Sequence, residues 1–192
     1  MRDAHTVVLV EGVSDKSAIE ALAERRGRNL ADEGVSLVAM GGATNIGTYI
    51  GRYGPAGRDL RLAGLCDVRE ESHFRRVLER AGFGSDLSRS DLEALGFFVC
   101  DADLEDELIR ALGTATVERV LDAEGELGSF RTLQKQPAWR EGTTHDQLRR
   151  FMGSGSGRKI RYSALLVAAL DPHHVPRPLN MLLAHLSGSR SR

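Results

Sequence analysis

Four short apolar runs, each followed by a segment with helical periodicity, constrain the fold of this chain more than any other feature. The runs are rich in β-branched or aromatic residues and span residues 7–10, 35–40, 62–66 and 97–100. Strands that alternate with helices predict a parallel sheet with right-handed crossovers and helices on its faces. We therefore expect an α/β protein with a parallel sheet of about four strands.

Acidic residues follow three of these runs directly, at Glu11, Asp67 and Asp101. In open α/β sheets, ligands bind beyond the carboxyl ends of the strands, where these three side chains are expected to gather. An acid that closes a buried strand needs a partner or a metal, and carboxylate oxygens suit Mg²⁺ or Mn²⁺. Asp15 lies one helical turn beyond Glu11 and can converge with it, although an acid in a first turn also simply offsets the helix dipole.

After residue 114 the strand pattern gives way to helix patterns near 114–124, 143–152, 158–170 and 178–186. We predict an α/β domain over 1–113, a helical appendage over 114–187 and a disordered tail over 188–192. Residues 101–130 hold nine acids and two bases, whereas residues 131–161 hold eight bases and two acids. A metal-binding half beside a phosphate-binding half would give this pattern, and so would two solvated helical regions that pair with each other.

The composition favours a cytoplasmic protein without a membrane segment. The longest apolar run, Ala164 to Leu170, is much shorter than the roughly 20 residues needed to span a bilayer, and the start lacks the apolar segment of a secretory signal. Cys66 and Cys100 each close an apolar run, where a buried thiol acts as a small hydrophobe. A disulfide framework is therefore not expected.

Several of these segments together resemble one known domain. They are the run from Val8 to Asp15 (VLVEGVSD), Gly41-Gly42 followed by Asn45, and Leu65-Cys66-Asp67. In their order and spacing they resemble the Toprim domain, in the form found in OLD-family nucleases, over residues 5 to 80. The resemblance implies a Rossmann-like Toprim sheet and metal-dependent chemistry on the phosphodiester backbone of nucleic acid.

Two later segments extend the resemblance. Asp103 to Leu108 is similar to a helix start of the family whose glutamate is a metal ligand, a role that would fall on Glu105. Lys159 to Ser163 is similar to a late segment whose lysine assists phosphate chemistry, a role that Lys159 would inherit. The resemblance thus implies Mg²⁺ or Mn²⁺ as cofactor, with a set of site residues: metal ligands Glu11, Asp15, Asp67 and Glu105, and catalytic residues Glu11 and Lys159.

One position departs from the Toprim pattern. The family usually has a second aspartate two residues after the acid of the third strand, but Arg69 stands there. A cation would repel a metal, so the second metal position depends on whether Glu70 or Glu71 replaces the missing acid.

The reaction implied by the resemblance is endonuclease hydrolysis of DNA, with RNA as an alternative substrate and no covalent protein nucleophile. Because OLD proteins join this domain to an ATPase that the present sequence lacks, a separately encoded ATPase partner or a homo-oligomer is expected. Arg69 also motivates an alternative, a non-catalytic nucleic-acid-binding or ATPase-partner regulatory module with a degenerate metal site. Nucleotidyl transfer, as in primases, is a third alternative.

Overall fold

A four-stranded parallel sheet forms the centre of the computed structural model, which describes residues 4–154 and 157–188. The strand order is β2-β1-β3-β4, and Val8 in the central strand pairs with Leu37 on one side and Ala63 on the other. The predicted α/β fold with about four parallel strands is confirmed. The strands are β1 (Thr6–Val10), β2 (Val35–Ala39), β3 (Arg61–Asp67) and β4 (Phe97–Cys100).

The side chains of β1 alternate between two cores because successive residues of a strand point to opposite faces. Val8 and Val10 join one hydrophobic cluster, and Val7 and Leu9 join the other. On the second face lie α2 (Ile46–Tyr53), α3 (Glu71–Arg80) and α4 (Arg89–Ala94). The two buried free cysteines belong to different clusters and so lie on opposite faces of the sheet.

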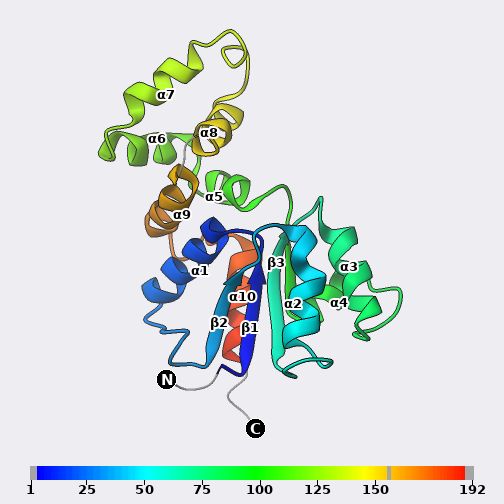
Figure 1. The fold of residues 1–192 in the computed structure, drawn as a ribbon. Helices are drawn as coiled ribbons and strands as arrows, with labels where there is room; N and C mark the ends of the chain where they lie inside the picture. The colour runs from blue at the N-terminus through cyan, green and yellow to red at the C-terminus, as the bar shows by residue number, and fades with distance from the viewer. Residues whose placement is uncertain (1–3, 155–156, 189–192) are drawn as a thin grey trace.

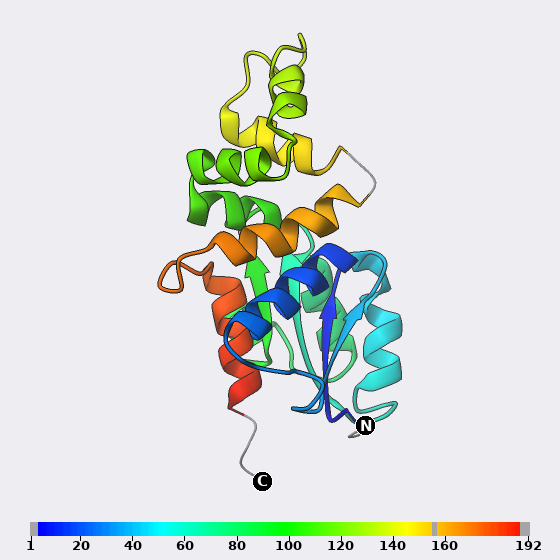
Figure 2. The same ribbon diagram turned by 90° about the vertical axis from the view of Figure 1, so that its left-hand side faces the viewer.

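The first face of the sheet is covered by α1 (Val13–Arg25) and α10 (Arg177–Ser187), and α9 (Arg158–Ala169) packs along α1. Four further helices lie between β4 and α9 in the sequence: α5 (Leu104–Leu112), α6 (Thr114–Ala123), α7 (Leu127–Gln134) and α8 (Thr144–Met152). Figures 1 and 2 show α6, α7 and α8 stacked beyond the carboxyl edge of the sheet, above α5 and α9. The helical region therefore overhangs the edge where ligands of α/β sheets bind.

The helix patterns anticipated most of the second half, but α4 and α7 were not predicted. Both are short, and α7 begins without a side-chain cap and contains Gly128, so its local signal is weak. One hydrophobic cluster continues from the first face of the sheet through α5 to α10. The division at residue 113 stays a prediction, as does the tail over 188–192, which from residue 189 onward lies outside the described residues.

None of the helices in residues 4–154 and 157–188 is both long and apolar enough to cross a bilayer.

The last helix is held on the sheet through His185. Its ring packs edge-on against the ring of Phe98, with the two ring centroids 6.0 Å apart, and Nη2 of Arg61 lies 2.6 Å from Nε2 of His185. Gly96, just before β4, has φ +93°, and a Cβ there would lie 2.6 Å from that same Nε2. The close approach of α10 to β4 thus requires glycine at position 96.

We expect Gly96→Ala to lower the free energy of unfolding by about 2 kcal/mol, because it adds backbone strain and displaces the His185 ring. Gly51→Ala is a matched control, since Gly51 lies inside α2 with open space around it, and this variant should be stabilised by about 0.5–1 kcal/mol. Denaturant titration of the three proteins measures both effects. Equal stability of the two variants would contradict the close packing of α10 on β4.

Candidate metal centre and active site

The backbone of Glu11 is anchored to the neighbouring strand by a two-glycine turn. The N–H groups of Gly41 and Gly42 both donate to the carbonyl of Glu11, at 3.0 and 3.1 Å, and their φ angles of +72° and +129° favour glycine. The amide of Asn45 donates to the carbonyl of Met40 at 2.9 Å and closes the turn. These contacts give the glycine pair and the asparagine of the sequence motif a physical role, which is to fix where β1 ends.

A cavity of about 170 Å³ lies at the carboxyl edge of the sheet, and all of the predicted site residues surround it. Glu11 follows β1, Asp67 ends β3, and Asp15 lies in the first turn of α1, where its carboxylate accepts a hydrogen bond from the N–H of Gly12 at 2.8 Å. The cavity is lined by Glu11, Gly12, Ser14, Asp15, Asp67, Asp103, Leu104, Glu105 and Lys159. Four separate segments of the chain therefore contribute to one site.

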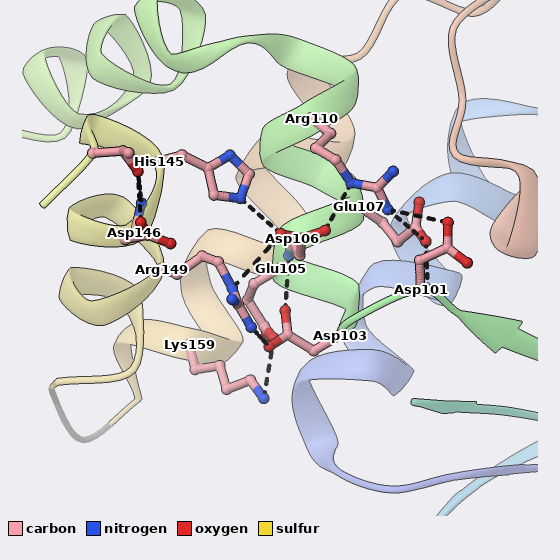
Figure 3. A network of polar contacts seen from close by, with 11 residues as sticks. Asp101, Asp103, Glu105, Asp106, Glu107, Arg110, His145, Asp146, Arg149 and Lys159 are labelled. Atoms are coloured by element: carbon pink, nitrogen blue, oxygen red, sulfur yellow. Dashed lines mark hydrogen bonds and ion pairs between the residues drawn. The ribbon is translucent and has the colours of Figure 1, made fainter. Parts of the chain in front are cut away.

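Glu105 and Lys159 face each other across this cavity from α5 and α9. The ammonium of Lys159 lies 3.2 Å from Oε2 of Glu105, as Figure 3 shows. Glu105 is only 6% exposed, and its Oε1 is buried without a hydrogen-bond partner among the described residues. An unsatisfied buried carboxylate oxygen is costly, so this atom fits a site built to hold a cation.

Asp103 also lines the cavity, although it was not among the residues predicted for the site. It is the N-cap of α5, where its side chain accepts from the N–H of Asp106 at 2.8 Å, and its other oxygen pairs with Arg149 of α8. In Figure 3 this pair lies directly beside Glu105 and Lys159. The pattern Asp103-Leu104-Glu105 before a helix was the available signal, because an N-cap acid always lies next to the first helical turn.

Asp101 does not line the cavity, so its expected place at this rim is a correction. Its side chain is 68% exposed and lies 3.7 Å from Arg89 and 3.8 Å from Arg110. Its backbone N–H donates to Glu107 at 2.9 Å. The chain turns after β4 to start α5, and this turn carries Asp101 outward and Asp103 inward.

Burial and mutual repulsion raise the pKa values of the acids in this cavity. For Asp67, burial first and then the carboxylates of Asp103, Asp15 and Glu11 raise the pKa to about 7. Burial is also the largest cause of the raised pKa values of Glu11, Asp15 and Glu105, while Lys159 opposes each increase. Such a cluster is unfavourable when fully ionised unless a cation neutralises it.

In the described ranges no three His, Cys, Asp or Glu side chains are arranged closely enough to hold a metal ion. Three of the acids are engaged elsewhere: Asp15 with the N–H of Gly12, Glu105 with Lys159, and Asp103 with Arg149. The donor set itself is all oxygen, which suits Mg²⁺ or Mn²⁺. Metal binding would therefore require small rotations that release these carboxylates from their present partners.

Neither acid next to Arg69 lines the cavity. The carboxylate of Glu71 bonds to Arg75 at 2.6 Å and to Arg89, and these two guanidinium groups lower its pKa despite its burial. Glu70 acts on the site only as the weakest of the causes that raise the pKa of Glu11. Arg69 itself is exposed. Asp103 is thus the acid that lines the cavity in addition to the predicted ligands.

The bases of residues 131–161 pair extensively with the acids of residues 101–130. In the helices, Arg131 lies 2.7 Å from Glu118 and Arg158 lies 2.7 Å from Glu126. These pairs agree with the interpretation of two mutually neutralising helical regions. The bases that pair in this way are Arg131, Arg149, Arg158, Lys159 and Arg161.

Comparison with known proteins gives a family match over part of the sequence and a shared fold. The family model of the overcoming lysogenization defect (OLD) protein-like Toprim domain matches residues 4–54. The C-terminal region of the Burkholderia pseudomallei OLD protein superposes with a TM-score of 0.74 at 22% identity, over 98% of this chain and 99% of that one. The C-terminal region of the Xanthomonas campestris pv. campestris OLD protein gives a TM-score of 0.74 at 24% identity, over 97% and 93% of the two chains.

At these identities the structural likeness establishes the fold alone. No curated protein gives a significant match.

Proposed function

We propose that the chain is a metal-dependent endonuclease that hydrolyses phosphodiester bonds of DNA. The match of residues 4–54 to the OLD protein-like Toprim domain supports this proposal. The observation that carries the proposal is the gathering of Glu11, Asp15, Asp67 and Glu105, with Lys159, around one cavity at the carboxyl edge of the sheet. A cluster of buried acids beside a lysine suits a site where a divalent cation and a phosphate meet. The coarser conclusion, a role in nucleic-acid metabolism, follows from the domain type.

The four acids would hold one or two Mg²⁺ or Mn²⁺ ions. When bound, such ions lower the pKa of water and neutralise charge on a phosphate. Asp103 takes the place of the acid lost at Arg69, because it is the additional carboxylate that lines the cavity. Lys159, once released from Glu105, places its ammonium against an oxygen of the scissile phosphate.

The test of this function is cleavage of supercoiled DNA, linear DNA and RNA by the purified protein in Mg²⁺, in Mn²⁺ and in EDTA. We expect metal-dependent nicking of DNA. Cleavage of RNA under the same conditions shows whether the protein distinguishes deoxyribose from ribose. A separately encoded ATPase partner and self-association remain predictions, and adding an ATPase partner or raising the protein concentration should then increase the rate. Efficient cleavage by a monomer in EDTA would contradict the proposal.

No tyrosine is expected to act as a nucleophile. Tyr162 is fully buried in α9, and its hydroxyl has no hydrogen-bond partner among the described residues. Tyr49 and Tyr53 stack on each other on α2, with ring centroids 6.3 Å apart, and do not line the cavity. Each Tyr→Phe variant should therefore cut at the wild-type rate within about twofold, as measured by nicking of supercoiled DNA. A tyrosine-linked DNA adduct that survives detergent would overturn this.

A non-catalytic binding module is the second candidate function, and two observations favour it. Arg69 replaces an acid of the Toprim pattern, and the cavity acids are paired with Gly12, Lys159 and Arg149 rather than grouped around a metal position. This candidate predicts nucleic-acid affinity that falls with salt, through phosphate contacts, without turnover in any metal. Salt-dependent binding with no product on any substrate would favour it over the nuclease.

A further inference from the structure

A second, larger cavity lies beside the candidate metal site, and we propose that it binds an unpaired nucleotide of the substrate strand. Its volume is about 550 Å³, within the range of cavities that bind small organic ligands. It shares Asp103, Glu105 and Lys159 with the metal cavity. The proposal deepens the proposed function, on which it rests, by naming the substrate class as single-stranded or locally unpaired nucleic acid.

Trp139 provides an aromatic surface on the wall of this cavity. It lies in the connection between α7 and α8, half-buried, with its indole packed against the hydrophobic cluster of the helical region. The buried amide of Gln147 donates to the carbonyls of Trp139 at 2.8 Å and Gly142 at 3.1 Å, and its oxygen accepts from Gln134 at 2.7 Å. The backbone of the connection is thus tied to α8, which Gln134 links to α7, while the indole packs against the hydrophobic cluster.

Arg150 lies over the Trp139 ring, with its guanidinium carbon 5.7 Å from the ring centroid. Its side chain is exposed and makes no ion pair or hydrogen bond within the described ranges, unlike the bases that pair with residues 101–130. On the preceding residue, Nε of Arg149 is buried 3.9 Å from a carboxylate oxygen of Asp106 and has no hydrogen-bond partner among the described residues. The cavity therefore contains cationic groups with unused donors beside an aromatic face.

An aromatic face with neighbouring arginines is the combination that binds single-stranded nucleic acid, because each base offers a π-face and each nucleotide a phosphate. A base inside a duplex is already stacked and paired, so it does not present its face to Trp139. Asp146 adds negative charge to the lining and accepts a hydrogen bond from Thr143 at 2.7 Å. The phosphates are therefore expected beside Arg149, Arg150 and Lys159, which leads the strand towards the metal cavity.

Trp139 is the only tryptophan of the chain, so its fluorescence reports on this cavity directly. The measurement is a titration of the Glu11→Gln variant in EDTA, where no cleavage occurs, with a dodecamer of deoxythymidylate. We expect quenching by the dodecamer, no quenching by an abasic strand of the same length, and weaker binding of a blunt duplex. Absence of quenching by the dodecamer, or equal quenching by the duplex, would overturn the proposal.

The same binding is measured on variants by anisotropy of a labelled strand. Trp139→Ala should weaken binding about 5- to 100-fold, and Trp139→Phe should retain most of the affinity. Arg150→Gln tests the cavity without disturbing a buried group, and Arg58→Gln is its control, an exposed arginine in the loop before β3 at the opposite end of the sheet. Equal affinity of Trp139→Ala, Arg150→Gln and the control would contradict a stacking site, provided that their thermal unfolding is unchanged.

The two proposals fail in different ways. If nucleic acid quenches the fluorescence of Trp139 but no substrate is cleaved, the result contradicts the proposed nuclease activity and supports nucleotide binding in the cavity. If Trp139→Ala and Arg150→Gln both cleave DNA with an unchanged KM, the result supports the nuclease activity and contradicts nucleotide binding in the cavity. If both hold, these variants raise KM more than they lower kcat.

Discussion

Replacing Glu11 with glutamine is expected to lower metal-dependent cleavage of DNA by a factor of about 10² to 10³. The variant keeps the size of the side chain and removes its charge, at the one predicted ligand whose backbone is anchored by the N–H groups of Gly41 and Gly42. A neutral amide is a poorer ligand for Mg²⁺ than a carboxylate. The loss should therefore appear in kcat, measured as the initial rate of nicking at saturating DNA and Mg²⁺.

Glu20→Gln is the matched control for this variant. Glu20 lies in α1, the helix that follows Glu11, but it is exposed, and among the described residues its one ion pair is a 3.8 Å contact with Lys16. The control should cut at the wild-type rate. Wild-type activity in both variants would remove Glu11 from the site or reveal a contaminating nuclease, and equal loss in both would point to a general folding defect.

Replacing Asp67 with asparagine should have opposite effects on stability and on metal binding. In the folded protein the pKa of Asp67 is about 7, raised by burial and by the neighbouring acids, whereas it is near 4 in an unfolded chain. Between pH 4 and 7 the folded state binds a proton that the unfolded state has lost, so this group makes stability fall as the pH rises through that window. Above pH 7 the ionised carboxylate is a full cost to the metal-free protein.

Asparagine cannot ionise, so Asp67→Asn should be more stable than wild type at pH 8 in EDTA, on the order of 1 kcal/mol once solvent screening is allowed for. At pH 4 the two proteins should unfold at the same temperature. With Mg²⁺ at pH 8 the order should reverse, because binding to the folded state raises the Tm of wild type but not that of the variant.

Thermal unfolding at pH 4 and pH 8, with and without Mg²⁺, measures all of these effects. Asp32→Asn serves as the control, since Asp32 is exposed in the loop before β2, at the amino end of the sheet. It should respond to neither pH nor metal differently from wild type. A lower Tm of Asp67→Asn in EDTA at pH 8 would show that Asp67 stabilises the metal-free fold and does not belong to a cluster of repelling acids.

The sheet and half of the site could be predicted from the sequence alone. Apolar runs that stop at Glu11 and Asp67 place both acids at the carboxyl edge, because parallel strands all end on the same side. Asp15 follows because a short turn leads directly from β1 into α1. These are local relations, in which strand ends and helix starts are read from neighbouring residues.

Among the later residues, Glu105 and Lys159 were expected only from the resemblance to a known family, and the tertiary structure decided that Asp103 joins them. Asp101 and Asp103 are both aspartates and lie two residues apart, and the direction of the turn into α5 places Asp103 at the cavity and Asp101 outside it. Lys159 meets Glu105 because α9 packs across α1 and α5, which no local pattern specifies.

The cavity that Trp139 and Arg150 line likewise depends on tertiary structure, because it forms where the connection after α7 meets α8 above the sheet. Neither Trp139 nor Arg150 belongs to a motif that the sequence analysis identified. Side chains that converge from distant segments are positioned by packing, and packing is a property of the folded chain as a whole.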